Sequence, residues 1–572
     1  WVASVTNIDW PSSKNLTSAQ QRSELITLLN KHQLNGMNCI MFQIRPSCDA
    51  FYMNAMEPWS EWLTGTQGTP PNPVYDPLQF AVEECKKRGM ELHAWFNPYR
   101  AVLNKNSSSV HFSHISKTHP EWIREYDALK LLDPGIPDVR EYVTQVILDV
   151  VKRYDIQGVH FDDYFYPYPK TGFTFEDDST FALYPNGFTD KDDWRRNNIN
   201  ILVQMISDSI KFYKPWVKFG ISPFGIWKNS STDPLGSATS GFESYYGIYA
   251  DSRKWMQEGW LDYINPQVYW SIGYNPAKYD VLVPWWTNNS FGKHLYIGQA
   301  AYKIGSSSPD PNWLNFSMMP DEIRLNRTYP EVHGSVFFSS KSITNNLGGI
   351  QDSLRNDLFK YPALIPTMPW KDSVPPNPPV NLSLFGDSNS VILTWEKPLP
   401  ASDGDAAKYF VIYRFKYPDT VNINDPRAIR IITTTDTTQY SDQLSGVGSD
   451  GYTFAVTSVD RLHNESSPAI VTFNITSIND NQIKEIDFSL EQNYPNPFNP
   501  VTKISYSISH PGLVLLDVYD VLGNEVSQIV NEFKSPGNYS VEFDAGNLSS
   551  GLYIYRITSG SHTAARKMLL LK

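Results

Sequence analysis

The stretch GVHFDDYFYP, residues 158–167, predicts a buried strand that ends abruptly in acidic residues. Successive side chains of a strand point to opposite faces, so Val159 and Phe161 share one face. If that face packs against an outer layer of helices, His160 and Asp162 point together toward the space that the sheet encloses. The alternation therefore favours a polar interior behind an apolar outer surface.

A second carboxylate, Asp163, follows Asp162 directly, and Pro167 and Pro169 keep the residues beyond it from forming a helix. Two adjacent carboxylates ringed by aromatic residues are costly to bury unless they are paired or take part in a reaction. A structural explanation is that one Asp caps the next helix or ties down a loop. The pattern of the other strands favours a functional site instead.

Strand-like and helix-like segments alternate from the start of the chain to about residue 365. Helices are predicted to begin near Ser18, Pro77, Pro137, Trp194, Ala250 and Pro320. Strands are predicted at residues 1–6, 38–46, 90–100, 158–167, 217–224, 261–270, 294–302 and 333–340. Eight strands that alternate with helices are the pattern of an α/β fold, the (β/α)8 or TIM barrel. A doubly wound open sheet is the alternative, but no GxGxxG motif follows any of the strands.

The rest of the chain is all-β. A proline-rich stretch, MPWKDSVPPNPPVNL, is typical of a stiff linker, and the short strand-like runs after it predict β-sandwich domains. The chain is therefore predicted to be multidomain. The predicted divisions are a barrel at residues 1–367, a linker at 368–378, a sandwich at 379–477, a linker at 478–487 and a second sandwich at 488–572.

The composition limits the partners. The 572 residues are 19% charged and 14% aromatic, with a formal net charge of −12, and this acidic balance argues against nucleic acid and anionic membranes. No run of 18 apolar residues predicts a membrane-spanning helix. The chain begins directly in a strand-like run, so we expect that an upstream segment has been removed. Cys39, Cys48 and Cys85 lack metal-ligand spacing and are expected in or near the core, so they do not settle the compartment.

Polar and aromatic residues collect at the predicted strand ends, where TIM-barrel active sites lie. Polar groups on one face of so many strands need a common hydrogen-bonding partner, and a polyhydroxylated ligand provides one. The residues predicted to bind it are Arg45, Asp49, His93, Trp95, Asn97, Arg100, His160, Tyr164, Gln267, Tyr269, Trp270, Gln299 and Tyr302. Structural alternatives stay open: Arg45 as a clamp on Asp49 or Asp162, the histidines as satisfied core residues, and the tryptophans as packing.

Glycoside hydrolysis needs two carboxyl groups. Asp162 is the first candidate, and Asp163 is its predicted partner if the strand ends or bulges there. The other candidate partners are Asp49, Glu57, Glu61 and Glu243. A Ser nucleophile elbow, an HExxH motif and a P-loop are absent from the sequence. His93, His160 and Asp162 could bind a metal, but the early HxH pair of amidohydrolases is missing, so no metal or cofactor is predicted.

Residues 1 to about 365 resemble the glycosyl-hydrolase-like family 10 proteins, bacterial (β/α)8 barrels linked to hydrolysis of peptidoglycan glycan strands. The blocks that carry the resemblance include WVASVTNIDWP, FQIRPSCDAFY, EPWSEWLTGTQG, ELHAWFNPYRA, GVHFDDYFYP and LDYINPQVYW. The resemblance implies that Asp162 and Asp163 lie in the active site, with the cleft lined by Arg45, Asp49, Asn97 and Gln267. Glu243 departs from the glutamine expected in relatives and is discounted as the second acid.

Two further resemblances concern the β regions. VPPNPPVNLSL, Trp395, Tyr413 and Tyr452 resemble a fibronectin type III domain, which we expect to be a spacer. YPNPFNP, VYDVLGNEV and SSGLYIYRI, within residues 488–572, resemble the C-terminal sorting domain of the type IX secretion system. That resemblance implies handling by the type IX machinery, with export through the periplasm to the cell surface or the medium.

The sequence thus predicts a secreted glycoside hydrolase that acts on a bacterial cell-wall glycan such as peptidoglycan. The alternatives are a hydrolase of another environmental polysaccharide and a non-catalytic glycan-binding surface module.

Overall fold

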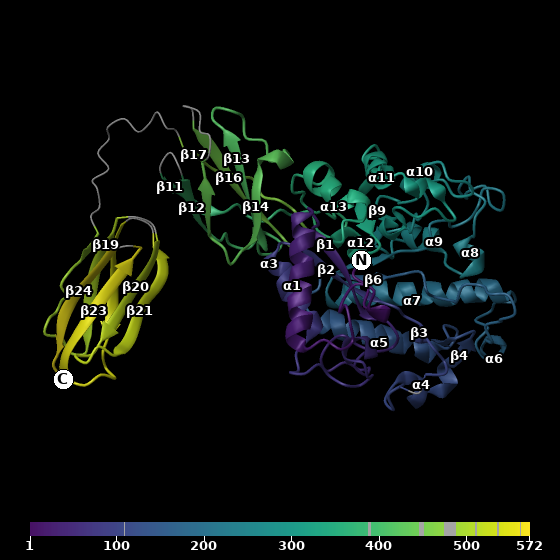
Figure 1. Ribbon diagram of the computed structural model, residues 1–572, viewed down its shortest axis with the longest axis horizontal. Helices are drawn as coiled ribbons and strands as arrows, with labels where there is room; N and C mark the ends of the chain where they lie inside the picture. The colour runs from purple at the N-terminus through teal and green to yellow at the C-terminus, as the bar shows by residue number, and fades with distance from the viewer. Residues whose placement is uncertain are drawn as a thin grey trace.

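The computed structural model describes residues 1–107, 109–386, 390–444, 451–473, 488–509, 512–534, 537–560 and 562–572 (Figure 1). Its N-terminal part is a parallel sheet in the order β1-β2-β6-β7-β8-β9-β10, with helices outside it. The strands are β1 (Cys39–Arg45), β2 (Glu91–Phe96), β6 (Gly158–Phe161), β7 (Lys218–Ile221), β8 (Tyr263–Ile264), β9 (His294–Gln299) and β10 (Val332–Phe337). The predicted TIM-barrel fold is confirmed.

The strand predicted at residues 1–6 is shorter than expected. Val2 forms a parallel bridge with Phe42 of β1, and Trp1 accepts a hydrogen bond from the amide of Ser340, which follows β10. Residues 1–3 therefore lie between β1 and β10 and close the barrel. The chain then turns into a 3-10 helix at Val5–Asn7, which ends the pairing.

The helices follow from recognisable end signals. Thr17 forms a capping box with Gln20 at the start of α1 (Ser18–Leu34), and proline occupies the first position of α3 (Pro77–Lys87) and α5 (Pro137–Arg153). The remaining α-helices of the barrel are α2 (Glu61–Thr64), α4 (Ile115–Thr118), α6 (Asp178–Leu183), α7 (Lys191–Tyr213), α8 (Ser244–Gly247), α9 (Ser252–Gln257), α10 (Tyr279–Thr287), α11 (Met318–Asn326), α12 (Ser340–Thr344) and α13 (Ile350–Ser353).

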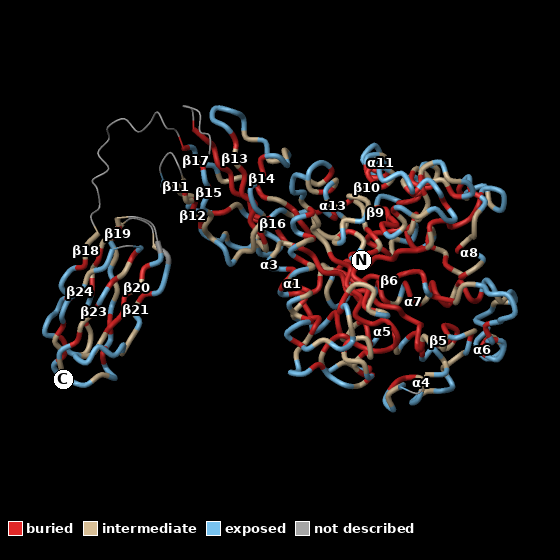
Figure 2. The backbone as a smooth tube through the Cα atoms, viewed as in Figure 1, coloured by how far each residue is buried: buried red, intermediate tan, exposed pale blue. Residues whose placement is uncertain are grey.

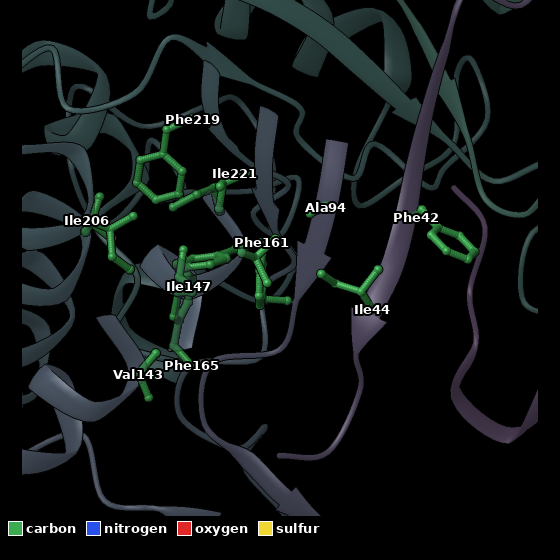
Figure 3. Packing of buried hydrophobic residues seen from close by; sticks show 14 of the residues in the cluster. Phe42, Ile44, Ala94, Val143, Ile147, Phe161, Phe165, Ile206, Phe219 and Ile221 are labelled. Carbon is green, nitrogen blue, oxygen red and sulfur yellow. The ribbon is translucent and has the colours of Figure 1, made fainter. Parts of the chain in front are cut away.

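The outward face of β6 packs as the alternation predicts. Phe161 lies against Phe165 and Phe219, with ring centroids 6.4 and 5.2 Å apart, and Ile147 of α5 and Ile206 of α7 belong to the same core (Figure 3). The barrel strands are almost continuously buried except for β10, which is mostly half-buried (Figure 2). A strand buried on both faces leaves its inward residues free to build a site at the barrel mouth.

One small sheet was not anticipated. The predicted strand at residues 90–100 stops at Phe96, and β3 (Arg100–Val102) joins β5 (Leu129–Leu132) and β4 (Ile123–Tyr126) in a separate antiparallel sheet. Asn97 and Pro98 break the run between the two strands, since proline cannot donate to a ladder. The break places Arg100 beside the end of β2.

The C-terminal regions are all-β, as predicted. The first pairs a sheet β11-β12-β15 with a sheet β14-β13-β16-β17, and the second pairs β18-β19-β22 with β21-β20-β23-β24. The strands of the first are β11 (Val380–Gly386), β12 (Ser390–Glu396), β13 (Tyr409–Lys416), β14 (Ile429–Thr434), β15 (Gln439–Gln443), β16 (Tyr452–Val459) and β17 (Ala469–Phe473). Those of the second are β18 (Ser489–Leu490), β19 (Val501–Ile508), β20 (Gly512–Tyr519), β21 (Glu525–Lys534), β22 (Gly537–Asp544), β23 (Gly551–Ser559) and β24 (His562–Leu570). The predicted linker at 478–487 lies outside the described residues, and the domain boundaries stay predictions.

The first β region contacts the N-terminal end of the barrel. His463 Nε2 lies 2.7 Å from Glu91 Oε1 at the start of β2, and Arg461 pairs with Asp155 at 2.5 Å. Within the proline-rich stretch, Lys371 pairs with Asp262 at 3.0 Å. The first β region and the proline-rich stretch therefore pack against the end of the barrel opposite the predicted site.

Candidate functional site

A cleft of about 440 Å³ lies at the carboxyl end of the barrel strands. Its walls combine two acids, several polar groups and many aromatic rings. The lining residues are Trp1, Ala3, Val5, Ile8, Gln43, Trp95, Arg100, Asp162, Asp163, Tyr164, Tyr168, Ser222, Phe224, Gln267, Tyr269, Trp270, Tyr302, Lys303 and Phe338. Asp162 and Asp163 are the acids among these described lining residues.

Asp162 is held by donors from two neighbouring segments. Its Oδ2 accepts hydrogen bonds from Trp95 Nε1 at 3.2 Å and from Asn97 Nδ2, and its Oδ1 accepts one from the Tyr164 amide at 3.2 Å. Burial raises the pKa of Asp162, while the charge of Arg100 and these donors act in the opposite direction. The donors offset part of the effect of burial and hold the carboxyl group of Asp162 in a fixed orientation.

Asp163 lies in the same cleft because β6 ends at Phe161, so strand alternation no longer turns it outward. Its Oδ1 accepts a hydrogen bond from Gln267 Nε2 at 3.0 Å, and its Oδ2 accepts one from the Tyr168 hydroxyl. Burial, together with the negative charge of Asp162, raises the pKa of Asp163 to about 6. Asp163 is thus poised to carry a proton near neutral pH.

Aromatic rings form the remaining walls. Trp270 meets Phe224 edge to face at 5.4 Å between centroids, and Tyr302 and Tyr164 are 47% and 42% exposed. The guanidinium of Arg100 lies 5.3 Å from the centroid of the Tyr164 ring. Exposed rings beside polar groups are suited to the apolar faces and hydroxyls of a sugar.

The structure brings most of the predicted binding residues to this cleft. Those that line it are Trp95, Arg100, Tyr164, Gln267, Tyr269, Trp270 and Tyr302. Asn97 is buried and joins two residues of the lining: it donates to Asp162, and its Oδ1 accepts a hydrogen bond from Gln43 Nε2 at 2.6 Å.

The other predicted binding residues lie elsewhere. Arg45 forms a buried bidentate pair with Glu57, at 2.7 and 2.6 Å, rather than clamping Asp49 or Asp162. The Gln299 amide donates to Glu322 Oε2 at 3.0 Å, behind the barrel wall. Gln299 has the same strand parity as Leu295 and Ile297, which belong to the hydrophobic core, so alternation turns it away from the cleft and toward the buried acid of α11.

The two histidines belong to the barrel interior. His93 lies between Glu91 and the Tyr263 hydroxyl, at 3.0 and 2.8 Å. His160 accepts a hydrogen bond from Trp1 Nε1 at 3.0 Å and contacts the same hydroxyl at 3.0 Å. Both side chains are satisfied core histidines, as the structural alternative proposed.

Asp49 lines a smaller neighbouring cavity of about 200 Å³ with Ser47, Glu61 and Gln67. Its Oδ1 accepts a hydrogen bond from the Ser47 amide at 3.1 Å. Burial raises the pKa of Asp49 to about 7. This acid is therefore not across the main cleft from Asp163.

Several cleft residues were missed in the sequence. Tyr168, Ser222, Phe224 and Phe338 come from loops or strand ends outside the strongest alternation. Tyr168 is the most informative of them, because its hydroxyl binds Asp163. Its only signal was its place among the aromatic residues after the acidic pair.

One group of possible metal ligands occurs among the described residues, Cys39, Glu91 and His93 at the opposite end of the barrel. Glu91 is already paired with Lys218 at 2.5 Å and with His463. A buried lysine within hydrogen-bond distance repels a cation, so these residues do not fit a metal site.

The fold and the cleft define a class, a TIM barrel with an acidic pair in an aromatic cleft. The family model described as Glycosyl hydrolase-like 10 matches residues 1–315, and the chain belongs to this family. The model described as Secretion system C-terminal sorting domain matches residues 492–571. The tail is that of a secreted or cell-surface protein, and no described helix is long and apolar enough to cross a membrane.

The relatives are named hydrolases. The chain is 45% identical over 473 residues to Glycosyl hydrolase YngK of Bacillus subtilis, covering 82% of this chain and 91% of the relative. It is 40% identical over 360 residues to Glycosyl hydrolase DigH of Escherichia coli K12, covering 59% of this chain and 81% of the relative. The solved PgaB glycoside hydrolase domain of Bordetella bronchiseptica aligns at 12% identity and a TM-score of 0.41, over 60% of this chain and 94% of that one.

Proposed function

We propose that this protein is a secreted glycoside hydrolase that cleaves a bacterial cell-wall glycan, with Asp162 and Asp163 as its catalytic carboxylates. The observation that carries the proposal is the pair of buried acids in one aromatic cleft at the carboxyl end of the barrel. Among the described residues, no cation lies at bonding distance from either acid. Burial of two adjacent acids in this way costs stability, so a catalytic role accounts for their presence.

The two acids have different environments, which supports different roles. Asp163, with a pKa of about 6, is suited to donate a proton to the leaving-group oxygen. Asp162 is bound by three donors and lies near Arg100, which favours its ionised form. Tyr168 and Gln267 fix the carboxyl group of Asp163.

The substrate assignment rests on three supports. The aromatic walls suit sugar rings, the relatives are named glycosyl hydrolases, and the family resemblance points to glycan strands of peptidoglycan. The sorting domain supports action outside the cell, on a glycan of the environment or of another cell's wall.

Release of reducing ends from purified, peptide-free peptidoglycan strands and from a polysaccharide panel tests the proposal. We expect release from the glycan strands by the wild type and loss of release, with binding retained, in Asp162→Asn. Release only from another polysaccharide would overturn the substrate. Equal, negligible release by both proteins with equal glycan binding would make the barrel a binding module.

The export route has its own test. Deletion of residues 488–572 in a host with type IX machinery should trap the protein in the periplasm. Normal appearance of the truncated protein in the medium would overturn this part of the proposal.

A further inference from the structure

The cleft holds an acid without an opposing partner. A hydrolase that uses two carboxyl groups places them on either side of the scissile bond, about 5–5.5 Å apart for retention and about 6.5–9.5 Å apart for inversion. Here Asp162 and Asp163 are consecutive residues at the end of one strand. They stand on one wall, close enough that the charge of Asp162 raises the pKa of Asp163.

The described residues that line the cleft include no acid besides Asp162 and Asp163. The other polar groups of the lining include the amides of Gln43 and Gln267 and the Ser222 hydroxyl, and aromatic rings make up much of the rest. The acids that the sequence offered as partners lie elsewhere. Asp49 and Glu61 line the smaller cavity, Glu57 pairs with Arg45, and Glu243 accepts a hydrogen bond from the backbone N–H of Asn229 at 2.7 Å.

The tyrosines of the cleft are also poor nucleophiles. Burial and the charge of Asp163 raise the pKa of Tyr168, so that its hydroxyl stays protonated and acts as a donor. Burial likewise raises the pKa of Tyr164, to about 12, and that of Tyr302. The group that attacks the anomeric carbon must therefore come from the substrate or from water.

We propose that the substrate supplies it: the sugar bound beside Asp162 carries a 2-acetamido group, whose carbonyl oxygen is the nucleophile. The inference rests on the proposed glycosidase function and deepens it. Asp162 accepts the acetamide N–H, which requires a fixed carboxylate such as its three donors produce. Asp163 is the acid beside it, on the same wall, as this reaction needs.

The reaction balances with water as its one co-reactant. The acetamide oxygen forms a bond to C1 while the glycosidic C1–O bond breaks, Asp163 gives its proton to the leaving oxygen, and Asp162 receives the N–H hydrogen bond. Water then attacks C1 of the cyclic intermediate and gives a proton to Asp163. The bond between C1 and the former acetamide oxygen breaks, the acetamide is restored, and the product keeps the anomeric configuration of the substrate.

The test uses one glycan with three acyl groups. Peptide-free glycan strands are de-N-acetylated, and portions are then re-acetylated, trifluoroacetylated or left as amines. Fluorine withdraws electrons from the acetamide oxygen, so we expect cleavage of the trifluoroacetylated strands to fall by more than about 100-fold relative to the re-acetylated control, as for loss of an intramolecular nucleophile. The free amines should not be cleaved, and the newly formed ends should retain configuration.

The outcomes separate the two claims. Equal cleavage of acetylated and trifluoroacetylated strands, or inversion at C1, would overturn the acetamide mechanism and leave the hydrolase intact. No cleavage of the re-acetylated control would overturn the proposed glycan hydrolase and this inference together. A thiazoline derived from N-acetylglucosamine gives a second readout: it should bind the wild type and bind Asp162→Asn at least about tenfold more weakly, a loss of about 1.4 kcal/mol.

Discussion

The two ends of this barrel each bury acidic groups, and they treat them in opposite ways. At the N-terminal end, Glu91 lies 2.5 Å from Lys218 and within hydrogen-bond distance of His93 and His463. Although burial favours the neutral acid, Lys218 and His463 hold the pKa of Glu91 well below its usual range. At the mouth, no described cation pairs with Asp163, and burial and the charge of Asp162 raise its pKa.

The comparison separates an acid that is paired within the fold from acids whose burial lowers the stability of the fold and serves the reaction. Removing one partner of a buried, hydrogen-bonded charge pair lowers the free energy of unfolding. Neutralising an unpaired acid that lies beside another acid should raise it. The same substitution, acid to its isosteric amide, should therefore have opposite consequences at the two ends.

The largest expected effect is on turnover at the mouth. Asp163→Asn removes the proton donor while its amide keeps the shape and can still accept from Tyr168, so kcat on glycan strands should fall by about 10²–10⁴. Steady-state release of reducing ends measures it. Glu91→Gln is the matched control and should leave kcat within a few-fold under conditions where it is folded. A comparable loss in both variants would erase the distinction between the ends.

The next effect is on stability at the base. Glu91→Gln leaves Lys218 buried without a charged partner, which should lower the free energy of unfolding by about 3–5 kcal/mol at pH 7. Because the folded pKa of Glu91 is depressed, its contribution is present above the unfolded pKa of about 4.3 and is lost as the pH falls through the folded value. Denaturant unfolding at several pH values measures both.

A double variant controls for the broken pair. Glu91→Gln combined with Lys218→Met removes both charges and should recover much of the lost stability, since replacing a whole buried pair is often nearly neutral. If the double variant were less stable than Glu91→Gln alone, Lys218 would not be the partner that matters.

A smaller effect of opposite sign is expected for stability at the mouth. Asp163→Asn should raise the free energy of unfolding at pH 7 by about 1–3 kcal/mol, because the wild type must ionise an acid whose folded pKa of about 6 exceeds its unfolded value of about 3.9. Since the folded pKa is raised, the wild type is free of this cost below about pH 4, and it acquires the cost as the pH rises through 6. The gain from Asp163→Asn should vanish in acid, and a gain that is independent of pH would point to another cause.

The sequence predicted the barrel and the acidic strand end because both depend on local signals. Alternation placed His160 and Asp162 inward, and the change of direction at Phe161 then brought Asp163 to the same cleft. Alternation could not say how deep each inward residue lies, so His93 and His160 were placed with the cleft although they are core residues. Pairings over long distances, such as Glu91 with His463, depend on how domains meet, and no local pattern encodes that contact.

The smallest expected effect concerns the cation at the mouth. Arg100 is the cation near Asp162 at the mouth, as Lys218 is the cation beside Glu91 at the base. The charge of Arg100 favours ionised Asp162, and its guanidinium lies over the Tyr164 ring. Tyr164→Ala removes a partly exposed cation–π contact of about 0.5–1 kcal/mol and should lower kcat/KM on glycan strands roughly 2–5-fold. Tyr164→Phe keeps the ring and should stay near the wild type. If Tyr164→Phe lost as much activity as Tyr164→Ala, the hydroxyl of Tyr164 would be the group that matters. The position of Arg100 would then depend on its hydrogen bonds to Pro46 and Asn97 and not on the Tyr164 ring.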